Sequence, residues 1–344
     1  MAAARRHTAE ATHHVCTLAA RTLFCLAAYS MCHGTAALAA EKKANAGDYP
    51  ARPVRVVVPF PPGGIDTVAR AVGHKLTETT GRQFVIDNRP GAGGTIGTAV
   101  VANAANDGYT TLFTSSAFAI SVAIYRKLPY DSVRDFAPVA SIASAPLLLV
   151  VHPSVPASNV KELIALAKAK PNALNYASNG SGSITFLAAE LLKSMAGVHI
   201  TEVAYKGAGP SLTALLSGEV QLMVAPLGPS LPHVRTGKLK ALGVPSAQRS
   251  ALFPELPTIA ESGLPGYEAL NWYGVLVPRG TSQRIVSVLN QHIVGALESS
   301  DVRARFAALG YDPTPSTPEQ FGKQVREEIN KWTQVIKDAG VPQS

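Results

Sequence analysis

The chain has 344 residues, of which 47% are hydrophobic and 16% are charged, and its formal net charge is +8. This length is sufficient for one large or two medium domains with a substantial core. The positive charge is spread along the chain without a run of Lys and Arg interleaved with aromatic residues, which excludes nucleic acid as an expected partner and suits a small anionic ligand.

The first 39 residues have the features of a secretory signal peptide. Arginines precede an apolar run from Thr22 to Met31 that is too short to span a membrane, and Ala37-Leu38-Ala39 has the small-residue pattern of a cleavage site. We therefore expect cleavage after Ala39, secretion into the periplasm and no stable insertion in a membrane. The pair Arg5-Arg6 leaves the twin-arginine route open, although the rest of that signal is missing.

All three cysteines (Cys16, Cys25 and Cys32) lie within this leader. The secreted chain would therefore contain no disulfide and no thiolate metal site. A protein of this kind must be stabilised by its core.

From residue 53 onward, short apolar runs rich in β-branched residues alternate with stretches of helical periodicity. This alternation predicts a mostly parallel sheet with helices on both faces. Strands are expected at 54–60, 84–87 and 110–114, and helices at 66–80 and after the glycine-rich stretch at 91–97.

A second unit with the same alternation begins near residue 147, and helices dominate the C-terminal tail. Strands are expected at 147–151, 174–177, 220–224 and 274–277, and helices at 158–170 (with Ser158 as its cap), 184–196, 282–298 and 318–339. We predict an α/β protein with a signal peptide at 1–39, a discontinuous first lobe at 40–148 and 272–344, and a second lobe at 149–271. Two strands near Leu147 and Val275 would join the lobes, and the cleft between them would bind the ligand.

Three glycine-rich loops follow predicted strands and open predicted helices, at 60–67, 88–95 and 178–183. Such loops present free backbone N–H groups and the positive end of a helix to an anion. A single loop of this kind can equally be an ordinary connector, but three at the same topological position favour a binding site. Residues 205–210, which include Lys206, are a fourth candidate.

Several side chains near these loops have two interpretations. Asp66 could be an ordinary N-cap or could orient a ligand, and Arg89 could bind a carboxylate, although we favour a structural salt bridge. Lys206 could add charge to the cleft or be a solvated surface residue. Trp272 and Tyr273 could cover the ligand or pack the hinge.

The spacing of the glycines does not fit a nucleotide site. The pairs Gly91/Gly93 and Gly180/Gly182 lack the third glycine of a dinucleotide fingerprint, and no P-loop occurs. No G-x-S-x-G nucleophile motif is present, and His74, His152, His199, His233 and His292 are dispersed without a metal-ligand pair. We therefore expect no cofactor, no metal and no catalytic activity.

Taken in order, several short motifs resemble those of the Bug-type solute receptors of tripartite tricarboxylate transporters. They cover nearly all of the chain after the leader. They are Tyr49-Pro50, Pro62-Gly63-Gly64 with Asp66 and Thr67, Asn88 to Gly94, Asp107 to Thr110, Leu128 to Asp131, Tyr176-Ala177-Ser178, Tyr205-Lys206-Gly207, Pro257-Thr258, Trp272 and Lys331-Trp332.

The resemblance implies a periplasmic binding protein with a two-lobed Venus-flytrap fold of type II-like architecture and two crossover hinge strands. A small mono-, di- or tricarboxylate or related acid would be held between the lobes, by the loop around Gly63 on one side and by backbone N–H groups and hydroxyls of 178–183 on the other. The candidate ligand-binding residues are Phe60, Pro62, Gly63, Gly64, Asp66, Thr67, Gly93, Ser115, Ser116, Ser178, Asn179, Gly180, Ser181, Gly182, Ser183, Tyr205, Lys206 and Gly207.

Two departures from the family pattern bear on the ligand. Phe186 and Gln221 stand where the family usually has His and Asp, and both are expected near the cleft of the second lobe. Because each exchange removes a titratable group, we hypothesise a pocket less suited to a cationic amine.

The favoured function is capture of the acid, closure of the lobes and delivery to membrane transporter subunits by a monomeric binding protein. One alternative is a sensory adaptor whose liganded form docks on a membrane kinase. A hydrolase or isomerase on the same lobes is a further alternative, disfavoured because no nucleophile–base pair is visible.

Overall fold

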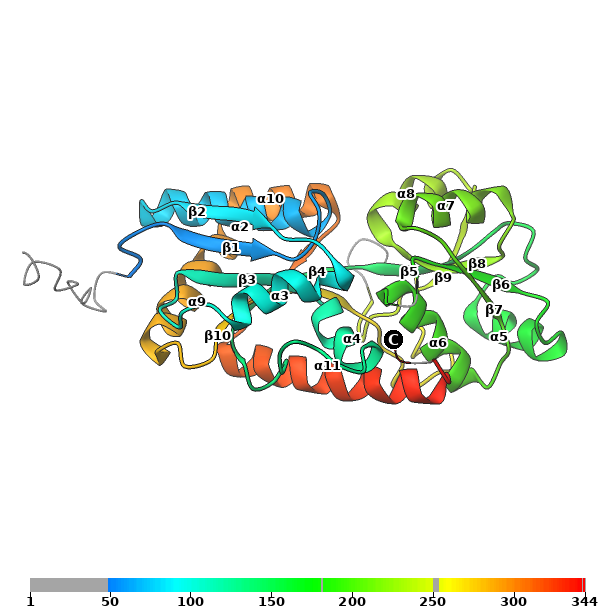
Figure 1. Cartoon of the computed structure of the whole chain (residues 1–344). Coiled ribbons are helices and arrows are strands. Elements are labelled where there is room, and N and C mark those ends of the chain that lie inside the picture. Colours follow the sequence, from blue (N-terminus) through cyan, green and yellow to red (C-terminus); the bar gives the residue numbers. More distant parts are fainter. Residues whose placement is uncertain (1–48, 181, 250–253, 342, 344) are drawn as a thin grey trace, which may run out of the picture. The chain divides into compact units, whose positions relative to one another are not determined.

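The computed structural model describes residues 49–180, 182–249, 254–341 and 343 of the chain. The predicted leader and its cleavage site lie outside the described residues, as does Ser181. The predicted α/β architecture is confirmed, with strands and helices alternating along two sheets (Figure 1).

The elements up to the first crossover between the sheets are β1 (Val54–Val58), α2 (Ile65–Thr80), β2 (Phe84–Asn88), η2 (Ala92–Gly94), α3 (Thr95–Ala102), β3 (Thr110–Ser115), α4 (Ala117–Ile124) and β4 (Phe136–Ala145). The elements of the second lobe are β5 (Leu147–Val151), α5 (Val160–Ala169), β6 (Asn175–Ser178), α6 (Ile184–Ala196), β7 (Thr201–Ala204), α7 (Ala208–Ser217), β8 (Leu222–Pro226), α8 (Leu227–Arg235) and β9 (Lys240–Gly243). The chain then returns through β10 (Asn271–Pro278), α9 (Gln283–Glu298), α10 (Ser300–Leu309), β11 (Asp312–Pro313) and α11 (Pro318–Asp338).

The first sheet has six strands in the order β11-β4-β10-β3-β1-β2, and the second has five in the order β7-β6-β8-β5-β9. Strands β1, β2 and β3 are parallel, as are β6, β7 and β8, while β10 and β5 run antiparallel to their neighbours β3 and β8. The expectation of a mostly parallel sheet is wrong, because the strands that carry the chain between the sheets run against their neighbours and both sheets are mixed. The predicted lobe limits, 148/149 and 271/272, fall inside β5 and β10, and they remain a proposal.

Both sheets direct the ends of their parallel strands toward the places where the chain crosses. In the first sheet, Ser115 at the end of β3 pairs with Tyr273 near the start of β10. In the second, Pro226 at the end of β8 pairs with Leu147 at the start of β5. The loops that follow β1, β2 and β3 and those that follow β6, β7 and β8 therefore lie at the crossover edges.

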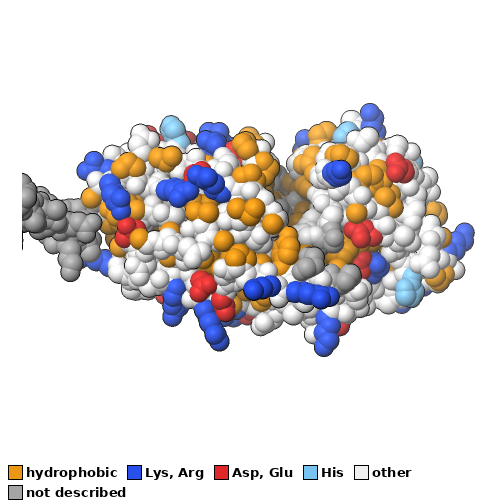
Figure 2. Space-filling view, viewed as in Figure 1, with side chains coloured by type: hydrophobic (Ala, Val, Ile, Leu, Met, Phe, Trp, Pro, Cys, Tyr) orange, Lys and Arg blue, Asp and Glu red, His pale blue; other side chains and the backbone are white. Residues whose placement is uncertain are grey.

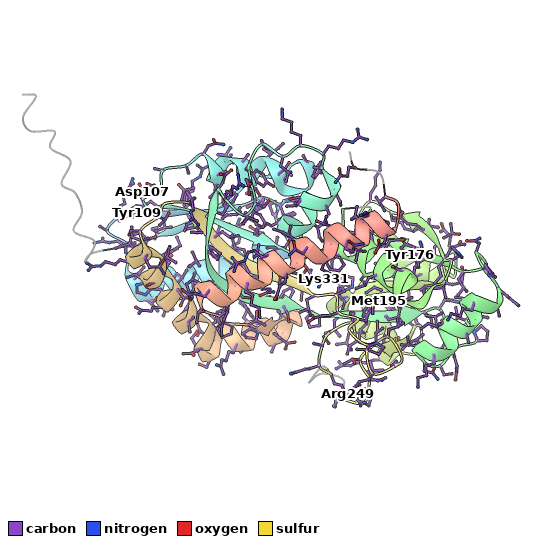
Figure 3. All side chains as sticks on the ribbon, turned by 90° about the horizontal axis from the view of Figure 1, so that it is seen from below. Asp107, Tyr109, Tyr176, Met195, Arg249 and Lys331 are labelled. Atoms are coloured by element: carbon purple, nitrogen blue, oxygen red, sulfur yellow. The ribbon has the colours of Figure 1, made fainter. Side chains whose placement is uncertain are left out.

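The crossovers themselves are short. Only Pro146 separates β4 from β5, and the return path is fixed in the second lobe by the Tyr267 hydroxyl, which donates to the Ala188 carbonyl at 2.7 Å. Helix α11 contacts α4 and β4 of the first lobe and α6 of the second. Lys331 lies on the stretch of α11 that passes from one lobe to the other (Figure 3).

Apolar side chains from both lobes form one continuous cluster on the α11 side of the molecule. This cluster includes Phe118 of α4, Leu187 of α6 and Trp332 of α11, all nearly inaccessible to solvent. Two further clusters lie on the other faces, one under α2, α9 and α10 and one under α7 and α8. Because the α11 side is packed without a break, it constrains how the lobes can move.

One predicted helix cap is wrong by a residue. The N-cap of α5 is Asn159 and not Ser158, because the Asn159 Oδ1 atom accepts from the Glu162 N–H at 2.9 Å. The Ser158 N–H instead donates to the Glu162 carboxylate at 2.7 Å.

Helix α11 begins with a full capping box between Thr317 and Gln320.

Gly274 on the return strand packs tightly against α11. A Cβ atom placed there would lie 2.1 Å from Phe321 Cζ, and the Phe321 ring itself packs edge-on to Trp272 at a centroid distance of 5.3 Å. A side chain at position 274 would therefore push α11 away from β10 and its neighbour β4.

We predict that Gly274→Ala lowers the free energy of unfolding by about 1–3 kcal/mol, because overpacking a fixed core contact forces side chains from their rotamers. Urea unfolding of the purified protein measures this. The matched control is Gly295→Ala in α9, where a Cβ would meet nothing within 4 Å and where Ala should raise stability by about 0.5–1 kcal/mol. Equal effects of the two substitutions would contradict the packing described.

Candidate functional site

The loop between β1 and α2 exposes backbone at the start of a helix. Gly63 and Gly64 have φ values of +113° and +43°, which L side chains rarely adopt, and a Cβ at either position would meet nothing within 4 Å. The N–H groups of Gly64 and Ile65 make no hydrogen bond to a described residue. This loop therefore presents free donors and open space at the positive end of α2.

The buried Asp66 carboxylate holds this loop by hydrogen bonds from the protein side. The residue is 4% exposed, and its Oδ2 atom accepts from Arg70 Nε at 3.0 Å and, more weakly, from the Gly63 N–H at 3.4 Å. The N-cap of α2 is Gly64, so the interpretation of Asp66 as an ordinary N-cap is wrong. The other carboxylate oxygen, Oδ1, is buried without a hydrogen-bond partner among the described residues.

The electrostatics keep Asp66 ionised. Burial would raise the pKa of this carboxyl, but hydrogen bonds from Arg70, Asn88 and the Gly63 N–H act in the opposite direction and hold the pKa below its usual range. Because Arg70 is engaged with both Asp66 and Asn88, its charge is compensated inside the protein.

The second glycine-rich loop packs directly against the first. The Asn88 amide donates to the Phe60 carbonyl at 3.0 Å, and a Cβ on Gly94 would lie 3.2 Å from the Phe60 ring. Arg89 forms the structural salt bridge that we favoured, with Asp87 at 3.0 Å. Pro62 and Gly93 are exposed and Thr67 is half-buried at this edge of the sheet.

Ser115 and Ser116 tie the end of β3 to the return crossover. Both are buried; the Ser115 hydroxyl accepts from the Ala117 N–H at 3.3 Å, and the Ser116 hydroxyl donates to Asn271 Oδ1 at 3.1 Å. Their hydroxyls are thus engaged within the protein, and a role in contacting ligand stays a prediction.

The second-lobe loop from 178 to 183 also uses its polar side chains internally. Ser178 Oγ donates to Glu202 at 2.5 Å, and the side-chain amide oxygen of Asn179 (Oδ1) accepts from the Ser211 hydroxyl at 2.7 Å. The Ser183 side chain accepts from the Phe186 N–H as the cap of α6. The expected use of serine hydroxyls as ligand donors is therefore not favoured at Ser178 and Ser183.

Backbone donors remain at the start of α6. The N–H groups of Ile184 and Thr185 precede the first capped N–H of this helix and bond to no described residue. Gly180 (φ +101°) has open space where a Cβ would stand, and Gly182 is exposed. The start of α6 therefore resembles the start of α2 in the donors that it leaves free.

In the fourth candidate loop, at 205–210, the polar side chains of Tyr205 and Lys206 have different surroundings. The Tyr205 hydroxyl donates to Glu219 at 2.8 Å, beyond the far end of α7, and burial together with this bond raises the pKa of Tyr205 to about 12. Lys206 is exposed and Gly207 begins α7. Of these three residues, Tyr205 directs its polar atom away from the crossover edge.

Gln221 was expected near the cleft, and this placement is wrong. It precedes β8, whose opposite end lies at the crossover, and its side chain accepts from the Asn175 N–H at 2.9 Å and donates to the Gly218 carbonyl at 3.2 Å. Phe186 is a buried residue of the first turn of α6. Of the two departures, only Phe186 therefore still supports the hypothesis that the pocket is less suited to a cationic amine.

Two residues at the site were not found from sequence. The Tyr125 hydroxyl lies 3.0 Å from the position that a Cβ on Gly93 would take, and Ile124 Cδ1 lies 3.6 Å from that of Gly182. The end of α4 thus approaches a glycine loop of each lobe. No periodicity marks these residues, because the approach depends on segments far apart in the chain.

The surface shown in Figure 2 is indented between the two lobes, and Lys and Arg side chains are scattered over it without forming one basic patch. In the part of the chain that is described, no group of three or more His, Cys, Asp and Glu side chains could hold a metal ion. Among the same residues, no helix has the length and apolar character needed to cross a membrane.

The pKa of Asp66 leads to a prediction on stability. Because its folded pKa is lowered, the ionised carboxylate stabilises the fold above its unfolded pKa of about 3.9, and this stabilisation is lost as the pH falls through the folded pKa. Asp66→Asn should lower the free energy of unfolding by about 1–3 kcal/mol at pH 7, and the deficit should shrink below about pH 4.

Urea unfolding at pH 7, 5 and 3 measures the deficit. Asp338→Asn, an exposed position on α11, is the control and should change stability little at any of these pH values. A deficit for Asp66→Asn that stayed constant with pH would show that the carboxylate charge does not stabilise the loop.

Comparison with known proteins identifies the family. The sequence model of one protein family, described as the tripartite tricarboxylate transporter family receptor, matches residues 68–341 of this chain. Protein BugT of Bordetella pertussis is 40% identical over 309 residues, which cover 89% of this chain and 94% of BugT.

Solved structures agree with this match. Rpa4515 of R. palustris, determined with adipate, has a TM-score of 0.74 at 39% identity and covers 86% of this chain and 100% of its own. MatC of Rhodopseudomonas palustris, determined with bound malate, has a TM-score of 0.70 at 36% identity and covers 84% of this chain and 100% of its own. The chain therefore has the fold of a two-lobed periplasmic binding protein, and it belongs to the tripartite tricarboxylate transporter receptor family, of the Bug type.

Proposed function

We propose that this protein is an extracytoplasmic solute-binding protein that captures a small carboxylate between its two lobes and delivers it to a tripartite tricarboxylate-type membrane transporter. The observation that carries the proposal is the matched pair of helix starts. The free N–H groups at Gly64 and Ile65 lie at the crossover edge of one sheet, and those at Ile184 and Thr185 lie at the crossover edge of the other.

A carboxylate is the ligand that these groups fit best. Its oxygens accept hydrogen bonds only, and the N-terminal end of a helix supplies both N–H donors and a positive partial charge. The arginines nearby do not compete for this role, because Arg70 and Arg89 are paired with Asp66 and Asp87. Two similar proteins were determined with adipate and malate, both of which are dicarboxylates.

Capture requires no chemical step from the protein. In the proposed sequence of events, the acid binds to the open cleft, the lobes close about the β4–β5 and β10 crossovers, and the closed form is recognised by the transporter subunits. Export to the periplasm through the N-terminal leader and a monomeric state are parts of the same proposal. The Gly/Ser loops bind and orient the acid by hydrogen bonds alone.

The proposed function predicts direct binding of a small acid. In a thermal-shift screen of the purified protein, adipate, malate or another small di- or tricarboxylate should raise the melting temperature, since a ligand at a hundredfold excess over Kd adds about 2.7 kcal/mol to stability. Mass spectrometry should recover the acid unchanged. The absence of any shift across carboxylates, in protein first unfolded and refolded to remove bound ligand, would overturn the proposal, and a changed acid would favour an enzyme.

A substitution in the loop before α2 tests where the acid binds. Gly63→Ala places a methyl group in the open space before α2 and strains a backbone with φ of +113°, so the Kd for the best acid should rise at least about tenfold, equivalent to 1.4 kcal/mol. Isothermal titration calorimetry measures the change.

Gly237→Ala is the matched control, because Gly237 also has a positive φ (+70°) and open space but follows the far end of α8. Both variants should lose some stability, and only Gly63→Ala should lose affinity. Equal affinities of the two variants would place the ligand elsewhere.

A further inference from the structure

We propose that Tyr125 is a specificity-determining residue, whose hydroxyl donates a hydrogen bond to the end of the ligand held by the first lobe. The inference rests on the proposed function and narrows the ligand class. The favoured ligand is an acid with an aliphatic body and a second oxygen-bearing end, which Tyr125 recognises.

The backbone at the end of α4 directs Tyr125 toward the glycine loops. Tyr125 is the C-cap of α4, with its N–H bonded to the Ser121 carbonyl and an extended conformation (φ −95°, ψ 128°). This conformation takes the ring out of the helix, and its hydroxyl reaches to 3.0 Å from the Cβ position of Gly93. A Cβ atom at position 93 would be in tight contact with the hydroxyl, so glycine at this position lets the hydroxyl come close to the loop.

The Tyr125 hydroxyl is available to a ligand. The hydrogen bonds among the described residues do not include the Tyr125 hydroxyl, and the Tyr125 side chain is half-buried and so in contact with solvent. Four other tyrosine hydroxyls have an internal acceptor: they are those of Tyr49 (Gly108 carbonyl), Tyr176 (Glu190), Tyr205 (Glu219) and Tyr267 (Ala188 carbonyl). Those of Tyr109, Tyr130, Tyr273 and Tyr311 have none among the described residues, so what distinguishes Tyr125 is its place beside Gly93. A half-buried phenol without such an acceptor at the edge of a binding loop is suited to a ligand oxygen.

A phenol also suits an anionic ligand chemically. It is a neutral donor, so it binds a carboxylate without bringing a second buried charge that would have to be desolvated. Hydrogen bonds to an ionised acceptor are about twice as strong as neutral ones. The hydroxyl can therefore discriminate between an acid that has a carboxylate or carbonyl at this end and one that has a methyl group.

The preceding residue determines what lies between the two ends. Ile124 is half-buried, and its Cδ1 lies 3.6 Å from the Cβ position of Gly182 in the second-lobe loop. Ile124 and Tyr125 therefore form a short wall next to loops of both lobes, apolar at Ile124 and hydrogen-bonding at Tyr125. The methylene groups of an aliphatic acid fit the apolar part.

The test compares acids of equal chain length with one or two carboxylates: adipate with hexanoate, and malate with 3-hydroxybutyrate, which keeps the hydroxyl of malate. Calorimetric titration of Tyr125→Phe should give a Kd for the diacid about tenfold above wild type, with that of the matching monoacid unchanged. Tyr109→Phe, at the outer end of the first lobe (Figure 3), should leave all values unchanged.

An equal ratio of diacid to monoacid affinity in wild type and Tyr125→Phe would overturn the inference, even if both proteins bind. If wild type binds none of the four acids, the inferred ligand class is wrong, whereas the proposed function is tested separately by the thermal-shift screen of all carboxylates. Ile124→Ala provides an independent variant: it should weaken adipate several-fold and malate less, because only adipate has four methylene groups to bury. Equal losses for adipate and malate would contradict the apolar role of Ile124. Circular dichroism and melting temperature check that each variant is folded.

Discussion

The candidate site depends on a constraint of chain geometry. Strands that are parallel in one sheet end at the same edge, and in both sheets that edge is where the polypeptide crosses to the other lobe. Helices α2 and α6 therefore begin next to the crossovers, and their free N–H groups follow from the strand directions. The antiparallel strands β10 and β5 are what make this possible, because each starts where its parallel neighbour ends.

The polar side chains around the loops stabilise loop geometry more than they offer themselves to a ligand. Asp66 with Arg70, Ser178 with Glu202 and Ser183 with the α6 backbone all form internal bonds. In the proposed function, these loops bind an anion mainly through backbone donors that are fixed in advance. This arrangement suits a receptor that must release its ligand to another protein.

On the opposite side, α11 and the continuous apolar cluster connect the lobes. The Glu328 carboxylate accepts from Trp332 Nε1 at 2.5 Å and pairs with Lys331, which in turn donates to the Glu268 carbonyl just before β10. These bonds hold the helix against the return crossover. We expect closure to occur by bending of the two crossovers, with α11 as a fixed support.

Much of the fold could be predicted from sequence because the signals are local. Apolar runs gave the positions of β1, β3 and β5, and glycines such as Gly63 and Gly64 indicated the loops that open helices. Where two neighbouring polar residues compete, as Ser158 and Asn159 do, the cap depends on side-chain geometry that sequence does not reveal. The orientation of Tyr205 toward Glu219, the position of Gln221 and the approach of Tyr125 to Gly93 all depend on tertiary packing, so residue type and spacing could not predict them.

In the proposed complex, one acid contacts the helix starts of both lobes at once. Hydrogen–deuterium exchange in the presence and absence of saturating adipate or malate, whichever binds more tightly, tests it most directly, because it reports on backbone N–H groups segment by segment. We expect binding to slow the exchange of backbone N–H groups in peptides covering both 63–67 and 182–187. Protection confined to one of these segments, or absent from both while the acid is bound, would contradict it.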